Sequence, residues 1–151
     1  MPTFSVNDDA PDWQRDHTRR YLDSNGADGH DWVAPNGDGP YPTLLLLTVG
    51  RRSGAERTLP LIYGDYDGAY VIIASKGGAP AHPSWYVNLA ANPEVWVQVR
   101  ERRTAATART ASGEERAALW KQLAAIYPPY DEYQERANPR EIPVVVLDPH
   151  D

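Results

Sequence analysis

The sequence has 151 residues, with 15 Lys and Arg against 21 Asp and Glu, and it contains no cysteine. The length suits one compact domain with a hydrophobic core. A net charge of −6 argues against nucleic acid or an anionic membrane as the main partner, and the lack of cysteine excludes disulfides, thiolate nucleophiles and zinc fingers. No apolar run approaches the roughly 20 residues that span a bilayer, and no signal peptide is recognisable. We therefore expect a soluble, cytoplasmic protein without stable membrane insertion.

The first part of the chain combines a polar start, a helical pattern and a long loop. Residues 1–10 are polar and show no periodicity, so we expect them to be disordered and residues 11–151 to form the single domain. A helix is predicted over residues 11–24, because ring side chains recur there every four residues, at Trp13, His17 and Tyr21. Residues 25–42 are rich in Gly, Asp and Pro and longer than most connections, which predicts a functional flap or a wrapping arm.

Six short strands are predicted in the remainder, over residues 43–49, 58–65, 69–75, 94–100, 104–109 and 142–147. Asp67-Gly68 favours a tight hairpin turn between the second and third of them. Helices are predicted over residues 83–91 and 112–127, the latter opening with a capping box between Ser112 and Glu115. Strands in hairpin-like order predict an α+β fold, in which a six-stranded antiparallel barrel leaves no exposed sheet edge and helices flank it.

A basic, glycine-rich turn follows the first of these strands. It places three arginines and a hydroxyl between and beside two glycines, as Gly50, Arg51, Arg52, Ser53, Gly54 and Arg57. Backbone N–H groups approach an oxyanion closely where no Cβ intervenes, and arginine clamps an oxyanion with two parallel hydrogen bonds. The turn is therefore a candidate anion cradle. The alternative is a hairpin turn whose arginines are only solvated.

A second glycine-rich segment lies between the strand at residues 69–75 and the helix at residues 83–91, and it reads Ser75-Lys76-Gly77-Gly78-Ala79. Paired glycines let the backbone approach a planar ligand, Ser75 and Lys76 supply donors, and the helix N-terminus that follows adds positive potential. With the basic turn, this segment would line one groove that faces an elongated polyanion. An ordinary strand-to-helix connection is the alternative.

Three tyrosines follow the third predicted helix at every third position, namely Tyr127, Tyr130 and Tyr133. On a short helix or turn this spacing builds one aromatic wall, which can stack on a flat substrate and donate phenolic hydrogen bonds to its oxygens. Alternatively, the rings cap the open end of the core, and Trp85, Tyr86 and Trp96 are more typical of a core than of a ligand site.

Taken in order, these motifs resemble a known family. Thr-Val-Gly-Arg-Arg-Ser-Gly-x-x-Arg is followed by Ala-Ser-Lys-Gly-Gly-Ala-x-x-x-Pro-x-Trp-Tyr-x-Asn-Leu, then Tyr-Pro-Pro-Tyr-x-x-Tyr and Ile-Pro-Val-Val-Val. The order is similar to that of the deazaflavin-dependent nitroreductases, also called coenzyme F-420-dependent quinone reductases. The resemblance covers residues 43–149 and implies their split β-barrel, an FMN-binding-like fold.

The resemblance also implies roles for individual residues. The phosphate and acidic tail of F-420 would be held by Arg51, Arg52, Ser53 and Arg57. The planar deazaflavin ring would be bordered by Ser75, Lys76, Gly77, Gly78 and Ala79, with Trp85 and Asn88 supporting that loop. The substrate pocket over the ring would be shaped by Tyr127, Tyr130 and Tyr133.

The implied reaction is hydride transfer from reduced deazaflavin to a flat, electron-poor acceptor, namely a quinone, a conjugated enone or lactone, or a nitroaromatic. Tyr130 or Tyr133 is the candidate for stabilising charge on the acceptor and supplying a proton, with Ser75 as a second candidate. Two positions depart from the family pattern. Ile62 replaces a substrate-side tyrosine found in some members and Ser84 replaces a larger methionine, which puts nitroaromatic reduction in doubt.

Two other classes of function stay open from the sequence. One is an oxidoreductase or binding protein of the same barrel type that uses FMN or haem. The lack of a convincing histidine ligand disfavours haem, and the polycationic turn suits a polyglutamate tail better than one FMN phosphate. The other is a non-catalytic F-420 carrier, which would need the basic turn and the Gly77-Gly78 loop but no tyrosine-lined pocket. The sequence predicts either a monomer or a homodimer.

Overall fold

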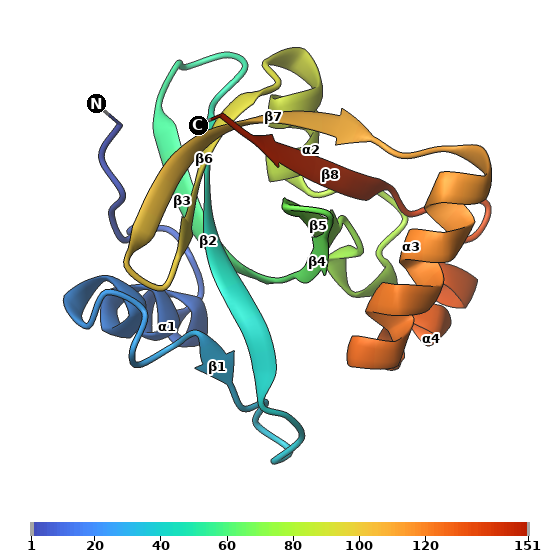
Figure 1. The fold of residues 1–151 in the computed structure, drawn as a ribbon, viewed down its shortest axis with the longest axis horizontal. Coiled ribbons are helices and arrows are strands. Elements are labelled where there is room, and N and C mark those ends of the chain that lie inside the picture. The colour runs from blue at the N-terminus through green and yellow to red at the C-terminus, as the bar shows by residue number, and fades with distance from the viewer. Residues whose placement is uncertain (1, 151) are drawn as a thin grey trace.

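The computed structural model describes residues 2–150 as one curled antiparallel sheet with helices packed around it (Figure 1). The helices are α1 (Asp12–Asp23), η1 (Lys76–Gly78), α2 (Ser84–Ala91), α3 (Gly113–Ile126) and α4 (Pro129–Ala137). The strands are β1 (Asp31–Trp32), β2 (Tyr41–Val49), β3 (Glu56–Ile62), β4 (Gly64–Tyr66), β5 (Ala69–Ile73), β6 (Glu94–Val99), β7 (Arg102–Thr110) and β8 (Val144–Pro149).

The sheet has the order β1-β2-β6-β7-β8-β5-β4, and β3 pairs with the other side of β2. β3 and β4 are separated by a single residue, Tyr63, yet β3 pairs with β2 whereas β4 pairs with β5. One stretch of chain therefore joins the two ends of the sheet and curls it into a barrel. The predicted antiparallel barrel is confirmed. The predicted strand at residues 58–65 is instead divided between two partners, and β1 brings the number of strands to eight.

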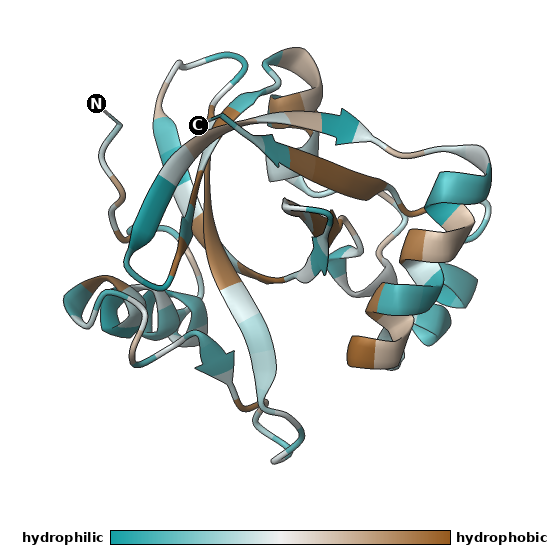
Figure 2. Cartoon of the chain, viewed as in Figure 1, coloured by the Kyte–Doolittle hydropathy of each residue, from teal (hydrophilic) through white to brown (hydrophobic). Residues whose placement is uncertain are grey.

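β2 is buried on both faces, which explains why it is continuously apolar. Successive side chains of a strand point to opposite faces of the sheet. Leu44 and Leu46 therefore pack inside the barrel, while Leu45 and Leu47 pack outside it with Tyr21 and Phe4. All four leucines are at most 1% exposed. Figure 2 shows hydrophobic residues along β2 and β8, in contrast to the largely hydrophilic α1.

Residues 2–10, part of the segment predicted to be disordered, contact the barrel in this structure, and residue 1 lies outside the described residues. Within residues 2–10, Phe4 is buried and the guanidinium of Arg103 lies 4.8 Å from the centre of its ring. The Asn7 side chain donates to the Thr58 carbonyl at 2.6 Å and accepts from the Thr58 amide at 3.2 Å. These contacts join segments distant in the sequence, so no local pattern in residues 2–10 could have indicated them.

Three of the helices, α1, α2 and α3, lie within one residue of their predicted bounds. The predicted capping box of α3 is wrong, because the Ser112 side chain makes no capping hydrogen bond. Glu115 instead accepts hydrogen bonds from Arg109 at 2.6 and 3.0 Å and from the Tyr66 hydroxyl at 2.9 Å. Among residues 2–150, no helix combines the length and the apolar character needed to cross a membrane.

Candidate functional site

The basic turn closes the hairpin of β2 and β3 and is held in shape by its own backbone. Gly50 donates to the Ala55 carbonyl at 2.8 Å, and Gly54 donates to the Gly50 carbonyl at 2.9 Å. The buried Asn88 of α2 accepts at Oδ1 from the backbone N–H of Arg51 at 3.2 Å and from its guanidinium at 2.8 Å. A depression of about 260 Å³ lies over the turn, and its lining residues are Gly50, Arg51, Arg52, Ser53, Arg57, Ser84 and Asn88.

Among the described residues, Arg57 makes the only ion pair of this turn, and its partner comes from the N-terminal segment. Its Nη2 lies 2.7 Å from a carboxylate oxygen of Asp9; the Arg57 side chain is partly exposed and that of Asp9 is mostly exposed. The hydrogen bond from Arg57 holds the pKa of the Asp9 carboxyl below its ordinary value. Within the described residues Arg52 has no such partner, so the turn presents an uncommitted guanidinium beside one that already holds a carboxylate.

The depression continues along β3 toward the barrel. A second cavity of about 130 Å³ shares Arg57, Ser84 and Asn88 with the first and extends to Leu59 and Trp85. The next three residues of β3 then line a third cavity. Cationic turn, intermediate cavity and apolar pocket therefore follow one another along a single strand.

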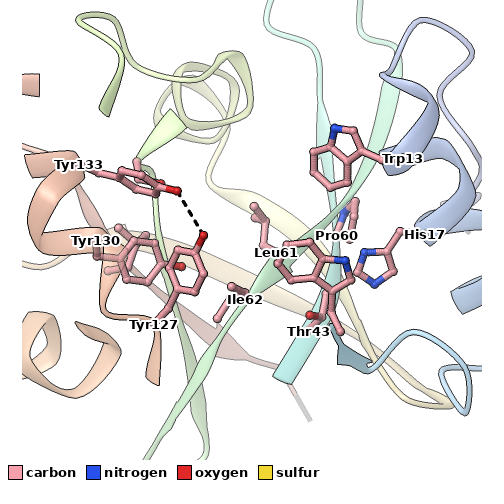
Figure 3. Close-up of a pocket in the computed structure, with 12 residues that line it drawn as sticks. Trp13, His17, Thr43, Pro60, Leu61, Ile62, Tyr127, Tyr130 and Tyr133 are labelled. Carbon is pink, nitrogen blue, oxygen red and sulfur yellow. Dashed lines mark hydrogen bonds between the residues drawn. The ribbon is translucent and has the colours of Figure 1, made fainter. Parts of the chain in front are cut away.

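The third cavity, of about 160 Å³, is the apolar pocket at the end of this path (Figure 3). It brings together five of the residues that the sequence predicted for the ring and the substrate, namely Ile62, Ser75, Tyr127, Tyr130 and Tyr133. Pro60, Leu61 and Ile62 of β3 lie between the tyrosines on one side and Trp13 and His17 on the other. Lys76, Gly77, Gly78 and Ala79 line none of these three cavities.

The three tyrosines form a connected aromatic wall, as their spacing predicted. The rings of Tyr127 and Tyr130 meet edge to face with centres 4.9 Å apart, and the hydroxyls of Tyr127 and Tyr133 are 3.2 Å apart. Burial raises the pKa of Tyr130, and burial together with the hydrogen bond to Tyr133 raises that of Tyr127. Both phenols therefore stay protonated at neutral pH and can donate hydrogen bonds into the pocket.

In the loop that contains Ser75, hydrogen bonds among the described residues occupy most of the backbone carbonyls, whereas three of the amides are not occupied. Lys76, Gly77 and Gly78 have φ angles of 47°, 62° and 82°, a left-handed run that the two glycines adopt without strain. Hydrogen bonds within residues 2–150 occupy the carbonyls of Ala74, Ser75, Lys76, Gly77 and Ala79. In the same described part of the chain the amides of Ser75, Lys76 and Gly77 have no partner, so they are free to bind a ligand oxygen.

One wall of the pocket was missed from the sequence. Trp13 and His17 come from α1, and Trp32 comes from β1 within the long loop. His17 stacks on Trp32 with ring centres 6.0 Å apart, and Trp13 lies 6.2 Å from Trp32. The four-residue spacing in α1 was visible in the sequence, and the long loop was expected to be functional. Only the three-dimensional pairing of β1 with β2 brings these rings to the tyrosines.

His17 predicts a pH dependence of stability. Its Nε2 donates to the Gly29 carbonyl at 2.8 Å, its Nδ1 is buried without a partner among the described residues, and burial lowers its pKa. Below a pH of about 6.5 the unfolded chain takes up a proton that the native imidazole resists. The free energy of unfolding should therefore fall as pH falls below that value, with a slope of up to about 1.4 kcal/mol per pH unit from this group.

Urea unfolding at pH 7.5, 6.5 and 5.5 measures this slope. His17→Gln keeps an N–H donor for Gly29 but does not titrate, so its slope should be smaller than that of the unmodified protein. The pKa of His82 is also lowered by burial, so part of the slope should persist in the variant. Equal slopes for the two proteins would contradict the assignment to His17.

Comparison with known proteins identifies the family. Residues 13–149 match the family model described as F420H(2)-dependent quinone reductase, in which F420H(2) is reduced coenzyme F-420. The chain belongs to this family. The resemblance found in the sequence is thereby confirmed, and the match extends further toward the N-terminus than the motifs did, into α1.

Individual relatives and solved structures agree with this assignment to the F420H(2)-dependent quinone reductase family. A protein of that name from Mycobacterium tuberculosis is 40% identical over 134 residues, which is 87% of this chain and 86% of that protein. A solved F420-H2 dependent reductase is 45% identical with a TM-score of 0.66, and the match covers 71% of this chain and 94% of that one. Another solved structure, described as a domain-swapped dimer, is 42% identical with a TM-score of 0.68 over 91% of this chain and 98% of its own. The split-barrel prediction is confirmed.

Proposed function

We propose that this protein is a reductase that transfers a hydride from reduced F-420 to an electron-poor conjugated acceptor. The observation that carries the proposal is the continuity of the site along β3, from the arginines of the basic turn to the tyrosine-lined pocket. F-420 is elongated, with an anionic tail at one end and a planar ring at the other. Its tail would match the basic turn, and its ring would lie toward the tyrosine-lined pocket. A carrier protein would not need the apolar pocket beyond it.

The residues present fit the cofactor at both ends. Arg51, Arg52 and Arg57 surround a depression in which arginines can bind phosphate or carboxylate with paired hydrogen bonds. The free amides of Ser75, Lys76 and Gly77 suit the carbonyl oxygens of a deazaflavin ring. Arg57 is already paired with Asp9, so we infer that binding of the tail at Arg57 displaces that carboxylate.

Reduced F-420 supplies a hydride and avoids easy one-electron exchange with oxygen. The protein's own residues bind, orient and exclude water. The apolar side chains Pro60, Leu61 and Ile62 limit water in the pocket, and the aromatic walls favour a flat acceptor. A phenolic hydroxyl that stays protonated can donate to the acceptor's oxygen as negative charge develops there. Tyr133, hydrogen-bonded to Tyr127, is the residue we assign to this donation.

The acceptor class follows from the shape and polarity of the pocket. Its lining contains the hydroxyls of Ser75 and the tyrosines, and among the described residues no lysine or arginine lines it. Such neutral donors suit a quinone or an enone, whose oxygens accept hydrogen bonds. Ile62 lies in this pocket, so the tyrosine hydroxyl that some family members place there is absent. We infer that quinones and enones are reduced in preference to nitroaromatics.

Tyr133→Phe tests the assigned donor. The variant keeps the ring that packs on Tyr127 but removes the hydroxyl, so turnover should fall about 100-fold while the affinity for F-420 stays the same. Stopped-flow oxidation of reduced F-420 by a quinone, together with a fluorescence titration of F-420, measures both quantities. A parallel loss of affinity and turnover would make Tyr133 a cofactor contact or a structural residue.

The experiment that tests the function is a titration of the purified protein with F-420 and with FMN, read by the fluorescence of each cofactor. Micromolar or tighter binding of F-420 with weak binding of FMN is the expected result. Preference for FMN would favour the flavin alternative instead. Tight binding of F-420 without oxidation by any quinone or enone would favour the carrier alternative.

A further inference from the structure

Arg140 lies in the segment of chain between α4 and β8, and its guanidinium donates hydrogen bonds to the loop that contains Ser75. Its Nε donates to the Ala79 carbonyl at 2.9 Å, its Nη2 to the Ser75 carbonyl at 2.8 Å and its Nη1 to the Ala74 carbonyl at 3.2 Å. Nη1 also lies 3.0 Å from Nδ1 of His82, which must accept because arginine only donates. One side chain therefore ties both ends of the loop together.

The same loop rests directly on α4. Arg136 of α4 donates to the Gly77 carbonyl at 2.8 Å. A Cβ at Gly78 would lie 2.6 Å from the backbone oxygen of Tyr133, so the loop and the helix touch backbone to backbone at this point. The position of the free loop amides is thus tied to the position of the helix that carries Tyr130 and Tyr133.

Burying the Arg140 guanidinium costs hydration free energy, which its hydrogen bonds must offset. Its side chain is partly buried, and burial lowers the pKa of the guanidinium, which means that the charged form has lost hydration. Its hydrogen bonds to three carbonyls offset that loss, since bonds from a charged donor are stronger than neutral ones. The three carbonyls therefore point toward Arg140.

We propose that Arg140 is a positioning residue, which fixes the loop of residues 75–79 on α4 and so sets the spacing between the free loop amides and the tyrosine wall. The inference deepens the proposed function and rests on it, because this spacing sets the distance between the proposed ring site and the proposed proton donor. Arg140 itself lines none of the three cavities of the site.

Hydrogen exchange of the cofactor-free protein tests the clamp directly. The amides of Gly78 and Ala79 are bonded within the loop, to the Ser75 and Lys76 carbonyls, and they report its opening. In Arg140→Ala they should exchange at least about tenfold faster, while the amides of β2 and β6 are unchanged. The matched control is Arg116→Ala, which removes an arginine bonded to the nearby Ile142 carbonyl but not to the loop. Unchanged exchange of Gly78 and Ala79 in the Arg140 variant overturns the clamp.

Titration with F-420 tests the purpose of the clamp. Arg140→Ala and Arg140→Lys should both raise the dissociation constant about tenfold, because a lysine ammonium does not reproduce the planar fork that reaches three carbonyls. Should Arg140→Ala fail to fold, Arg140→Lys carries both measurements. Faster loop exchange with unchanged affinity and turnover would overturn the positioning role. If the unmodified protein binds no F-420, the proposed function fails, and the exchange result shows separately whether the clamp exists.

Discussion

Tyr21→Ala is expected to lower the free energy of unfolding by about 4 kcal/mol, the largest stability effect that we predict. The Tyr21 ring is fully buried between α1 and the outer face of β2. Its hydroxyl accepts from the Arg100 amide at 2.9 Å and donates toward the carbonyls of Thr43 and Gln98 at 3.0 and 3.2 Å. Removing it leaves a cavity and deprives the Arg100 amide and the two carbonyls of their hydroxyl partner, so α1 loses a buried anchor on the sheet. Urea unfolding followed by circular dichroism measures the change.

Tyr21→Phe separates the ring from the hydroxyl. This variant keeps the packing and loses only the hydrogen bonds, so its cost should be about 1–3 kcal/mol. If Phe proves as destabilising as Ala, the hydroxyl dominates and the packing argument is wrong. Because α1 also carries Trp13 and His17, Tyr21→Ala should raise the KM for the acceptor even at temperatures where the protein stays folded.

Arg57→Ala is expected to weaken the binding of F-420 by about 1–3 kcal/mol, which is about 5- to 150-fold in the dissociation constant. The reason is the loss of a charge-assisted contact to the anionic tail at the basic turn. Fluorescence titration at low and moderate ionic strength measures the effect, and the loss should shrink as salt screens the interaction. Affinity that does not change in this variant would refute the anion cradle.

Asp9→Ala is the matched control, and its effect should have the opposite sign. Asp9 holds the guanidinium of Arg57 at 2.7 Å, so its removal frees a cation for the cofactor tail. The pair is exposed and water-screened, so the gain in affinity should be small. In the double variant without Arg57 and Asp9, removal of the carboxylate should bring no gain, because its partner is gone.

Local sequence signals predicted most of the barrel. Asp67 and Gly68 adopt φ angles of 47° and 86°, as their tight hairpin turn requires, and Tyr66 pairs with Ala69 across it. The bounds of the helices could be predicted from proline positions and from the helical spacing of side chains. The capping box was wrong: in the fold the Glu115 carboxylate pairs with Arg109, and the Ser112 side chain makes no capping hydrogen bond. The burial of Phe4 was missed for a related reason, since its partners lie far along the chain.

The candidate site was predicted where its residue types are distinctive. Arginines beside glycines and tyrosines at a fixed spacing have a recognisable chemistry, and the fold brings Ser75 and the tyrosines into one pocket. Arg140 escaped because its partners are backbone carbonyls, which carry no sequence signature. Trp32 escaped because β1 is only two residues long and lies in a segment whose composition is typical of a loop.

The burial of β2 on both faces has a consequence for the integrity of the protein in solution. Leu45 and Leu47, outside the barrel, are covered by Phe4 and Tyr21, and so by the segment that precedes residue 25. Proteolytic cleavage that releases this segment would leave a barrel whose newly uncovered apolar patch favours aggregation. Protease inhibitors during purification and a fusion tag that spares the N-terminus should therefore improve the yield of monodisperse protein.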